Sequence, residues 1–218
     1  FLKKKMSYFL GIKKFNLKSF SNHYNFPIYI NRKNGHALVI SGVGSIKSAV
    51  ATMYLNKTFN PGQFVAWINI GIAGHFQGPV GTLFQAIKVV NNDNGKSFFP
   101  GLRFSKLAKA AELYTVSSSE NEFTLPVLYD MEAAGFCEIA PSLSCNELTF
   151  VLKIVSDTSE QSQSLITKKM IADLFKKNSA MIDNLLQAVV KIVDRERARL
   201  GDPIEMDGIM CSLHFTET

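Results

Sequence analysis

The chain has 218 residues, of which 46% are hydrophobic and 19% are charged, proportions that suit one globular domain with a sizeable core. Its net charge is +6, but residues 1–92 hold eleven Lys and Arg and no acid, whereas the remainder holds 13 basic and 18 acidic residues. Because the basic residues of the first part are scattered among Phe and Tyr without a recognisable nucleic-acid motif, we do not expect a nucleic-acid partner.

Apolar runs alternate with helical patterns along the chain, which is typical of an α/β fold. An Asn34-Gly35 dipeptide predicts the turn of a hairpin, and the nearly all-apolar run at 65–70 predicts a strand buried on both faces. In chain order, we expect strands at 27–30 and 36–41, a helix at 46–54, strands at 65–70 and 83–90, a helix at 106–113, strands at 114–117 and 127–128, a helix at 131–140 stopped by Pro141, a strand at 150–155 and one long amphipathic helix at 170–190.

The cysteines and the apolar stretches narrow the class of protein further. Cys137, Cys145 and Cys211 lack the spacing of metal ligands, and their odd number argues against a disulfide framework, so a reducing cytoplasm is the simplest location. Every long apolar stretch is broken by Gly, Asn or Lys, and none reaches the roughly 20 residues of a membrane helix. We therefore expect a soluble cytoplasmic protein without a metal or another cofactor.

Two glycine-containing loops follow expected strands, where open α/β sheets bind their ligands. Gly42-Val43-Gly44 opens a helix, so its backbone amides are placed to face an anion or an activated water, or it is simply a tight packing turn. A dinucleotide-binding fingerprint would need a further glycine where Lys47 stands. The segment Asn69–His75 contains two glycines that let the backbone approach a flat ligand such as a purine, or merely turn the chain. His75 itself is interpreted as a hydrogen-bonded loop histidine.

Two short acidic motifs lie in the C-terminal half. Asp130-Met131-Glu132 opens a helix rich in small residues, and Ser156-Asp157 ends an apolar run. One carboxylate that accepts from two vicinal hydroxyls and a second that gives a proton to a leaving group are the minimum for breaking an N-glycosidic bond. The alternatives are a surface Glu that complements a helix dipole and an Asp that caps a turn.

The order and spacing of these four motifs, with Gln161 shortly after the last, resemble the purine nucleoside phosphorylase and nucleosidase superfamily. The resemblance covers about residues 26–193 and is greatest to the methylthioadenosine/S-adenosylhomocysteine nucleosidase branch. It implies a mixed, strongly twisted central sheet flanked by helices. It also implies a purine nucleoside substrate, water or phosphate as the nucleophile, and a homo-oligomer.

The resemblance implies a role for each motif residue. Glu132 would accept from the ribose hydroxyls, and Met131 would pack against the sugar. Asp157 would be the general acid that protonates N7 of the purine, kept protonated by burial and oriented by Ser156. The purine would lie beside Ala73-Gly74.

Two further sites are implied less directly. Phe123 would contact the purine, because the family often places an aromatic residue at this point of the chain. The loop Gly42-Val43-Gly44 would face the nucleophile or an anion. None of these roles calls for a metal.

The sequence departs from the family pattern in three places. Nucleosidases usually carry a water-activating glutamate just after their first strand, whereas the first acid here is Asp93. The phosphate-binding arginines of the phosphorylases find no match, which favours hydrolysis over phosphorolysis. Ile72 replaces a small hydroxyl residue often seen in the glycine-rich loop.

Two explanations of these departures remain open. Either a segment upstream of Phe1 supplies the strand and its glutamate, or the chain is a degenerate member that binds nucleosides without efficient turnover. We therefore divide the chain into a basic segment at 1–25, interpreted as the remnant of a truncated first element, a nucleosidase-like domain at 26–200, and an unassigned tail at 201–218.

Overall fold

A computed structural model describes residues 26–31, 34–101, 103–118, 124–159 and 166–200. The expected segments 1–25 and 201–218 lie outside the described residues. In chain order, the described elements are β1 (Ile28–Asn31), β2 (His36–Val39), α2 (Ser45–Phe59), β3 (Trp67–His75), β4 (Leu83–Asn91), β5 (Ser97–Phe98), β6 (Lys109–Thr115), β7 (Leu128–Asp130), α3 (Ala133–Leu143), the short 3-10 helix η1 (Asn146–Leu148), β8 (Thr149–Thr158), α4 (Lys168–Lys177) and α5 (Ser179–Leu200).

The central sheet has six strands in the order β5-β4-β6-β7-β3-β8 and is mixed, as the family resemblance implies. Strands β4, β6 and β7 are parallel neighbours, and so are β3 and β8, whereas β3 and β7 run antiparallel. The start of β4 also pairs antiparallel with β8, so the sheet curls until its two ends meet. The predicted hairpin forms a separate two-stranded sheet from β1 and β2.

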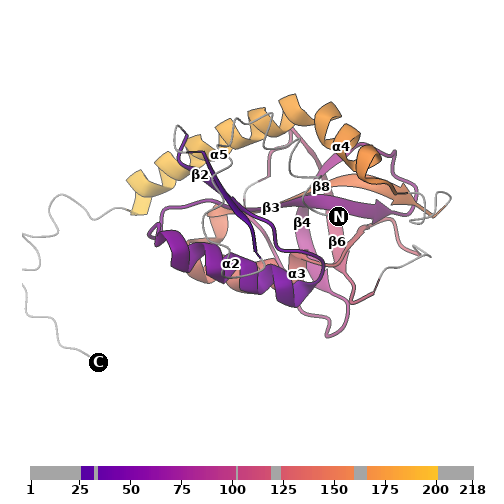
Figure 1. Cartoon of the computed structure of the whole chain (residues 1–218), viewed down its shortest axis with the longest axis horizontal. Helices are drawn as coiled ribbons and strands as arrows, with labels where there is room; N and C mark the ends of the chain where they lie inside the picture. Colours follow the sequence, from indigo (N-terminus) through magenta and orange to yellow (C-terminus); the bar gives the residue numbers. More distant parts are fainter. Residues whose placement is uncertain (1–25, 32–33, 102, 119–123, 160–165, 201–218) are drawn as a thin grey trace, which may run out of the picture.

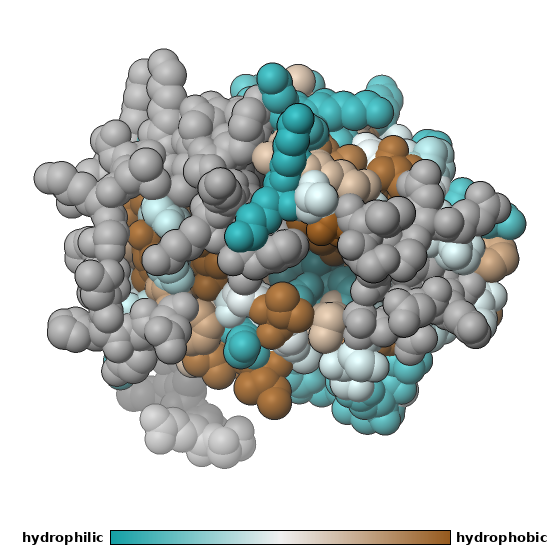
Figure 2. Space-filling view, turned by 45° about the vertical axis from the view of Figure 1, so that its right-hand side comes forward, coloured by the Kyte–Doolittle hydropathy of each residue, from teal (hydrophilic) through white to brown (hydrophobic). Residues whose placement is uncertain are grey.

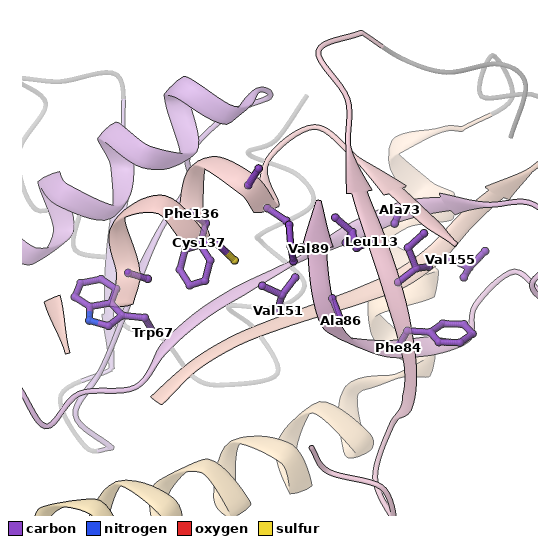
Figure 3. Packing of buried hydrophobic residues seen from close by; sticks show 14 residues of the cluster. Trp67, Ala73, Phe84, Ala86, Val89, Leu113, Phe136, Cys137, Val151 and Val155 are labelled. Atoms are coloured by element: carbon purple, nitrogen blue, oxygen red, sulfur yellow. The ribbon is translucent and has the colours of Figure 1, made fainter. Parts of the chain in front are cut away.

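Helices cover both faces of the sheet: α2 and α3 lie on one side, and α4 and α5 on the other (Figure 1). Alternate residues of β8 serve the two layers, because Val151 and Val155 belong to the core under α3 and Leu152 and Ile154 to the core under α4 and α5. Figure 3 shows the first of these cores, with Phe136 of α3 among strand residues. Both faces of β8 are therefore buried, although this mainly apolar strand contains Lys153.

The surface of the molecule mixes apolar and polar residues. Figure 2, in which the right-hand side of Figure 1 is turned forward, shows hydrophobic and hydrophilic residues side by side on this face. Among the helices of the described segments, none combines the length and the apolar character needed to cross a membrane.

The helix predicted at 106–113 is wrong, because this segment enters strand β6 at Lys109. Its Lys, Ala, Glu and Leu residues favour a helix locally. In the fold, however, β6 pairs along its whole length with β4 and at its end with β7. Backbone pairing on both sides and complete burial of Leu113 outweigh a helix propensity that amounts to a few tenths of a kcal/mol per residue.

Two predicted helix boundaries also differ from the structure. Pro141 does not stop α3, which runs on to Leu143; the proline removes one backbone donor within the last turn only. The single helix predicted at 170–190 is two helices that meet at Asn178. The Asn178 side chain donates to the carbonyl oxygens of Gly81, at 2.9 Å, and Leu174, at 2.9 Å, so a buried polar residue interrupts the helix where it is fastened to the sheet.

We expect Asn178→Ala to lower the free energy of unfolding by about 1–3 kcal/mol, because it leaves a buried carbonyl oxygen of Gly81 without its donor. Urea unfolding followed by circular dichroism measures the change. Asn92→Ala, at an exposed position, is the matched control and should stay within about 0.5 kcal/mol of the parent protein. An equal loss in both variants would contradict the anchoring role of Asn178.

Candidate active site

The N-terminus of α3 is fastened by three side chains from different parts of the chain. The backbone amides of Ala133–Gly135 donate in turn to Asp130 Oδ2 at 2.9 Å, Thr115 Oγ1 at 2.9 Å and Ser45 Oγ at 2.8 Å. The Thr115 hydroxyl donates onward to Asp130 Oδ1 at 2.7 Å. Because these amides have no partner within the helix, the three contacts both satisfy them and fix the position of the helix start.

Glu132 is the residue immediately before this helix, so its backbone is held by the same contacts. Its Oε1 accepts from the backbone amide of Gly44 at 3.1 Å, which joins the start of α3 to the start of α2. Burial raises the pKa of the Glu132 carboxyl above its ordinary value. The positive charge of Lys153 and the Gly44 and Met131 amides oppose that rise, and the negative charge of Asp130 adds to it.

Gly42 and Gly44 have φ angles of 85° and 109°, which favour glycine, so the tight-turn interpretation of this loop holds for its backbone. The amide of Gly44 donates to Glu132, a side chain of the protein itself. Val43 points outward and is 52% exposed. The sequence placed this loop at a helix start correctly but gave no sign of its contact with Glu132.

Ser156 and Asp157 lie within β8 at an irregularity. Ala73 of β3 is opposite Val155 and Gly74 is opposite Asp157, so Ser156 is an extra residue in the strand, a β-bulge. The Ser156 hydroxyl lies 2.5 Å from Asp157 Oδ1 and 3.3 Å from the carbonyl oxygen of Ala73. Both side chains are buried. The Ser156 hydroxyl therefore contacts the Asp157 carboxyl directly.

Gly74 brings the two acidic motifs together. It is paired with Tyr129 of β7 on one side and with Asp157 of β8 on the other. Since neighbouring strands are about 4.8 Å apart, Tyr129 and Asp157 are separated by about 10 Å across the β3 backbone. Asp130, Met131 and Glu132 follow Tyr129 directly. Motifs 25 residues apart in the sequence thus flank Ala73-Gly74, the segment expected beside the purine.

His75 ends β3 and is held by hydrogen bonds, as expected. Its Nδ1 accepts from the amides of Gln77 at 3.2 Å and Gly78 at 2.7 Å, and its ring stacks on Phe84 with 5.7 Å between centroids. Burial lowers the pKa of the imidazole. Because Nδ1 accepts from two amides, the ring hydrogen is on Nε2, and these local contacts account for the position of the side chain.

The described arginines do not gather near Glu132. Arg103 is exposed, and Arg195, Arg197 and Arg199 belong to α5, in the helical layer on the opposite side of the sheet from α3 (Figure 1). Arg197 and Arg199 pair with acids of the same helix. Within the described segments, no three His, Cys, Asp or Glu side chains are grouped to hold a metal ion. Phe123 and Gln161 lie outside the described residues, as does Arg32.

Sequence reasoning missed the residues that support the site. Thr115 and Ser45 resemble ordinary strand and helix-start residues, and no local pattern marks their contact with α3. Lys153 was visible as a lysine in the middle of an apolar run, and a charge at such a position signals a buried ion pair. Its ammonium nitrogen lies 2.6 Å from Asp130 Oδ2.

Several solved structures resemble the fold of this chain. A 5'-methylthioadenosine nucleosidase from Arabidopsis thaliana aligns at 15% identity over 94% of this chain and 95% of its own, with a TM-score of 0.64. A futalosine hydrolase mutant from Helicobacter pylori aligns at 12% identity over 83% and 94%, with a TM-score of 0.63. A methylthioadenosine/S-adenosylhomocysteine nucleosidase from Colwellia psychrerythraea, in complex with adenine, aligns at 16% identity over 77% and 89%, with a TM-score of 0.56.

The chain has the nucleosidase fold. This confirms the fold predicted from the order of the four motifs. No protein-family model and no curated protein matches the sequence. At identities of 12–16%, the likeness establishes the arrangement of the strands and helices, so the roles of individual residues rest on the geometry described above.

We expect Glu132→Gln to stabilise the protein at neutral pH, because Gln keeps an acceptor for Gly44 and removes a desolvated charge. A carboxyl whose folded-state pKa is raised binds more protons when folded, so ionisation costs stability as pH rises from the ordinary value of 4.5 through the folded value. The gain should therefore be present at pH 7–8, at about 2–4 °C in Tm, and vanish below about pH 4. Thermal unfolding between pH 4 and 8 tests it; an equal gain at every pH would contradict the explanation.

Proposed function

We propose that the protein is a nucleosidase that hydrolyses the N-glycosidic bond of a purine nucleoside of the methylthioadenosine or S-adenosylhomocysteine type. The observation that carries this proposal is that β7 and β8, the strands that lead into the Glu132 motif and carry Asp157, lie on opposite sides of β3 at Gly74, and that each of the two carboxyl groups has its own hydrogen-bond support. The likeness in fold to two nucleosidases and a futalosine hydrolase supports the same class of reaction.

In this proposal, Glu132 holds the sugar. When ionised, its carboxylate accepts from the two vicinal ribose hydroxyls, and the Gly44 amide keeps the carboxylate in one orientation. Met131, which is partly buried beside it, packs against the sugar face. Fixing the ribose in this way orients its anomeric carbon relative to the purine and to the nucleophile.

Asp157 acts on the base. It donates its proton to N7 of the purine while the bond between N9 and the anomeric carbon breaks, so the base leaves neutral. The ribosyl group, which gains oxocarbenium character, takes up the oxygen of water, and one water proton is released. Ser156 fixes the Asp157 carboxyl. Ala73 and Gly74 form the backbone beside which the base lies, and Phe123 is proposed as its aromatic contact.

Hydrolysis is preferred to phosphorolysis because phosphate needs cationic side chains. The described arginines near the C-terminus lie on α5, across the sheet from Glu132. Lys153, the cation close to Glu132, forms an ion pair with Asp130. The alternative of a phosphorylase would therefore need phosphate ligands other than these arginines and Lys153.

The second candidate is a nucleoside-binding domain with little or no turnover. The sequence observation that favours it is the absence of any acid before Asp93, since family nucleosidases carry their water-activating glutamate early in the chain. Such a domain would keep the Glu132 contact and the Ala73-Gly74 backbone. It would differ from the enzyme in catalysis and not in affinity.

We expect the purified protein to release free base from methylthioadenosine or S-adenosylhomocysteine without phosphate, measured by chromatography, with adenosine and inosine as comparisons. Asp157→Asn should lower kcat by about 10²–10⁴-fold, because it cannot give up the proton, and leave the Kd of the nucleoside nearly unchanged. Asp173→Asn, at an exposed position of α4, is the matched control and should leave both constants unchanged.

The outcomes separate the candidates. Release that requires phosphate indicates a phosphorylase. Nucleoside binding without release indicates the binding domain. Unchanged turnover in Asp157→Asn contradicts the role of Asp157 in any of these reactions.

We also propose that the protein forms a homo-oligomer. In α2 the usual pattern is inverted: small residues such as Ser48 and Ala51 face inward, while Ile46, Val50 and Met53 are exposed at one-turn spacing. Ile46 is 81% exposed. An apolar stripe facing outward is typical of a contact with another chain, and a second copy is the partner that the family resemblance implies.

We expect the protein to elute as a dimer or a larger assembly in size-exclusion chromatography with light scattering, and Ile46→Glu to dissociate it by placing a charge in the contact. A Glu in the first turn suits the helix dipole, so the monomer should remain folded. Lys57→Glu, an exposed change at the other end of α2, should leave the assembly intact. A monomeric parent protein would contradict the proposal.

A further inference from the structure

The pair formed by Lys153 and Asp130 is the described ion pair that lies wholly inside the protein. The two side chains are 1% and 0% exposed, and the ammonium nitrogen lies 2.6 Å from Asp130 Oδ2. The comparable pair between Lys88 of β4 and Glu112 of β6 is 32% and 43% exposed and therefore contributes little. Burying two charges costs free energy that their attraction does not always offset, so such a pair in a nucleosidase fold calls for a functional explanation.

The path of the Lys153 side chain connects three strands. Lys153 lies in β8 and Asp130 ends β7, with β3 between them in the sheet. The residue of β3 directly opposite Lys153 is Gly71, and a Cβ atom added there would lie 3.2 Å from the ammonium nitrogen. The lysine therefore crosses β3 where that strand has no side chain. This gives Gly71 a reason other than the approach of a flat ligand, which the sequence had suggested.

Asp130 links Lys153 to the start of α3 and so to Glu132. Its two oxygens accept from Thr115 and from the amide of Ala133, the first residue of α3, and the second oxygen also meets Lys153. Glu132 is the adjoining residue on the chain. Without the ammonium group, Asp130 would be a buried charge without its counterion, and the start of α3 would lose the fixed point that Glu132 depends on.

Lys153 also acts on Glu132 through its charge. Within the described segments, the charged groups that influence the Glu132 carboxyl are Lys153 from β8 and Asp130 from β7, and the effect of Lys153 is the larger. The buried Cys137 thiol of α3 adds no charge, because burial, followed by the field of Asp130, raises its pKa to about 12. Lys153 thus favours the ionised form of Glu132, which is the form that accepts hydrogen bonds from sugar hydroxyls.

We propose that Lys153 is a positioning residue: it places Glu132 through its ion pair with Asp130, and its charge favours the ionised form of Glu132 that binds the sugar. The absence of a side chain at Gly71 lets Lys153 cross β3 to Asp130. The sugar-binding part of this inference rests on the proposed function. The electrostatic link between Lys153 and Glu132 does not, so the two can be tested separately.

The link is tested by following the Glu132 carboxyl carbon in a ¹³C-labelled sample by NMR as pH is varied, with Glu132→Gln identifying its signal. In Lys153→Met the titration midpoint of Glu132 should move to higher pH, and in Lys153→Arg it should return toward the parent value. Lys88→Met removes a lysine that also pairs with a glutamate on the adjacent strand, and it should leave the midpoint unchanged.

Two further variants keep the link testable if Lys153→Met does not fold. Asp130→Asn with Lys153→Met removes both buried charges, and the Glu132 midpoint should still rise, by less than in the single variant, because Lys153 has the larger effect. Gly71→Ala keeps the charge but crowds the ammonium group, and it should move the midpoint in the same direction by a smaller amount. A midpoint unchanged in every folded variant would overturn the proposal, since a merely structural lysine would change stability alone.

Sugar binding is then measured as the Kd of methylthioadenosine against pH. In Lys153→Met the Kd should rise about tenfold for each pH unit by which the assay lies below the Glu132 midpoint, and the pH of half-maximal affinity should follow that midpoint. Midpoints that shift while Kd does not would overturn the sugar-binding part alone. If the parent protein binds no nucleoside, the proposed function fails, and the NMR titration still decides the link.

Discussion

The buried carboxylate of Asp130 is the point on which the candidate site depends. A carboxylate that is 0% exposed is tolerated only when its oxygens are hydrogen-bonded and its charge is balanced. Thr115 of β6, the first amide of α3 and Lys153 of β8 meet these needs together. Because these partners come from three elements, the contacts fix the start of α3 relative to the sheet. Glu132 is placed as a consequence of this arrangement.

The hydrogen bonds around the start of α3 hold the site in place, but burial of the Glu132 carboxyl is energetically unfavourable. Glu132 is a partly buried acid whose ionised form is disfavoured by desolvation, and the structure offsets this only in part through Lys153 and the Gly44 amide. This unfavourable desolvation is confined to Glu132, because the neighbouring contacts are satisfied, including the hydrogen bond from Gly135 to Ser45 where α2 approaches α3 closely.

The sheet contributes by bringing distant residues to one backbone segment. Strand β3 has β7 on one side and β8 on the other, and the bulge at Ser156 sets which residue of β8 faces Gly74. A one-residue change in that register would exchange Ser156 and Asp157. The geometry of the site is thus fixed by strand pairing, which acts over long sequence separations, more than by any local motif.

The sequence by itself determined the alternation of strands and helices, the hairpin at Asn34-Gly35, the mixed nucleosidase-like fold and the motifs around Glu132 and Asp157. These features can be predicted because hydrophobic periodicity, turn residues and the order of motifs are properties of the linear sequence. Only the tertiary structure decided that 109–115 is a strand, that Asn178 divides the last helix, and that Gly44 binds Glu132. It alone also paired Lys153 with Asp130 across Gly71. Each of these depends on at least one contact between groups more than 20 residues apart, and the energy of such contacts outweighs local preferences and leaves no local pattern.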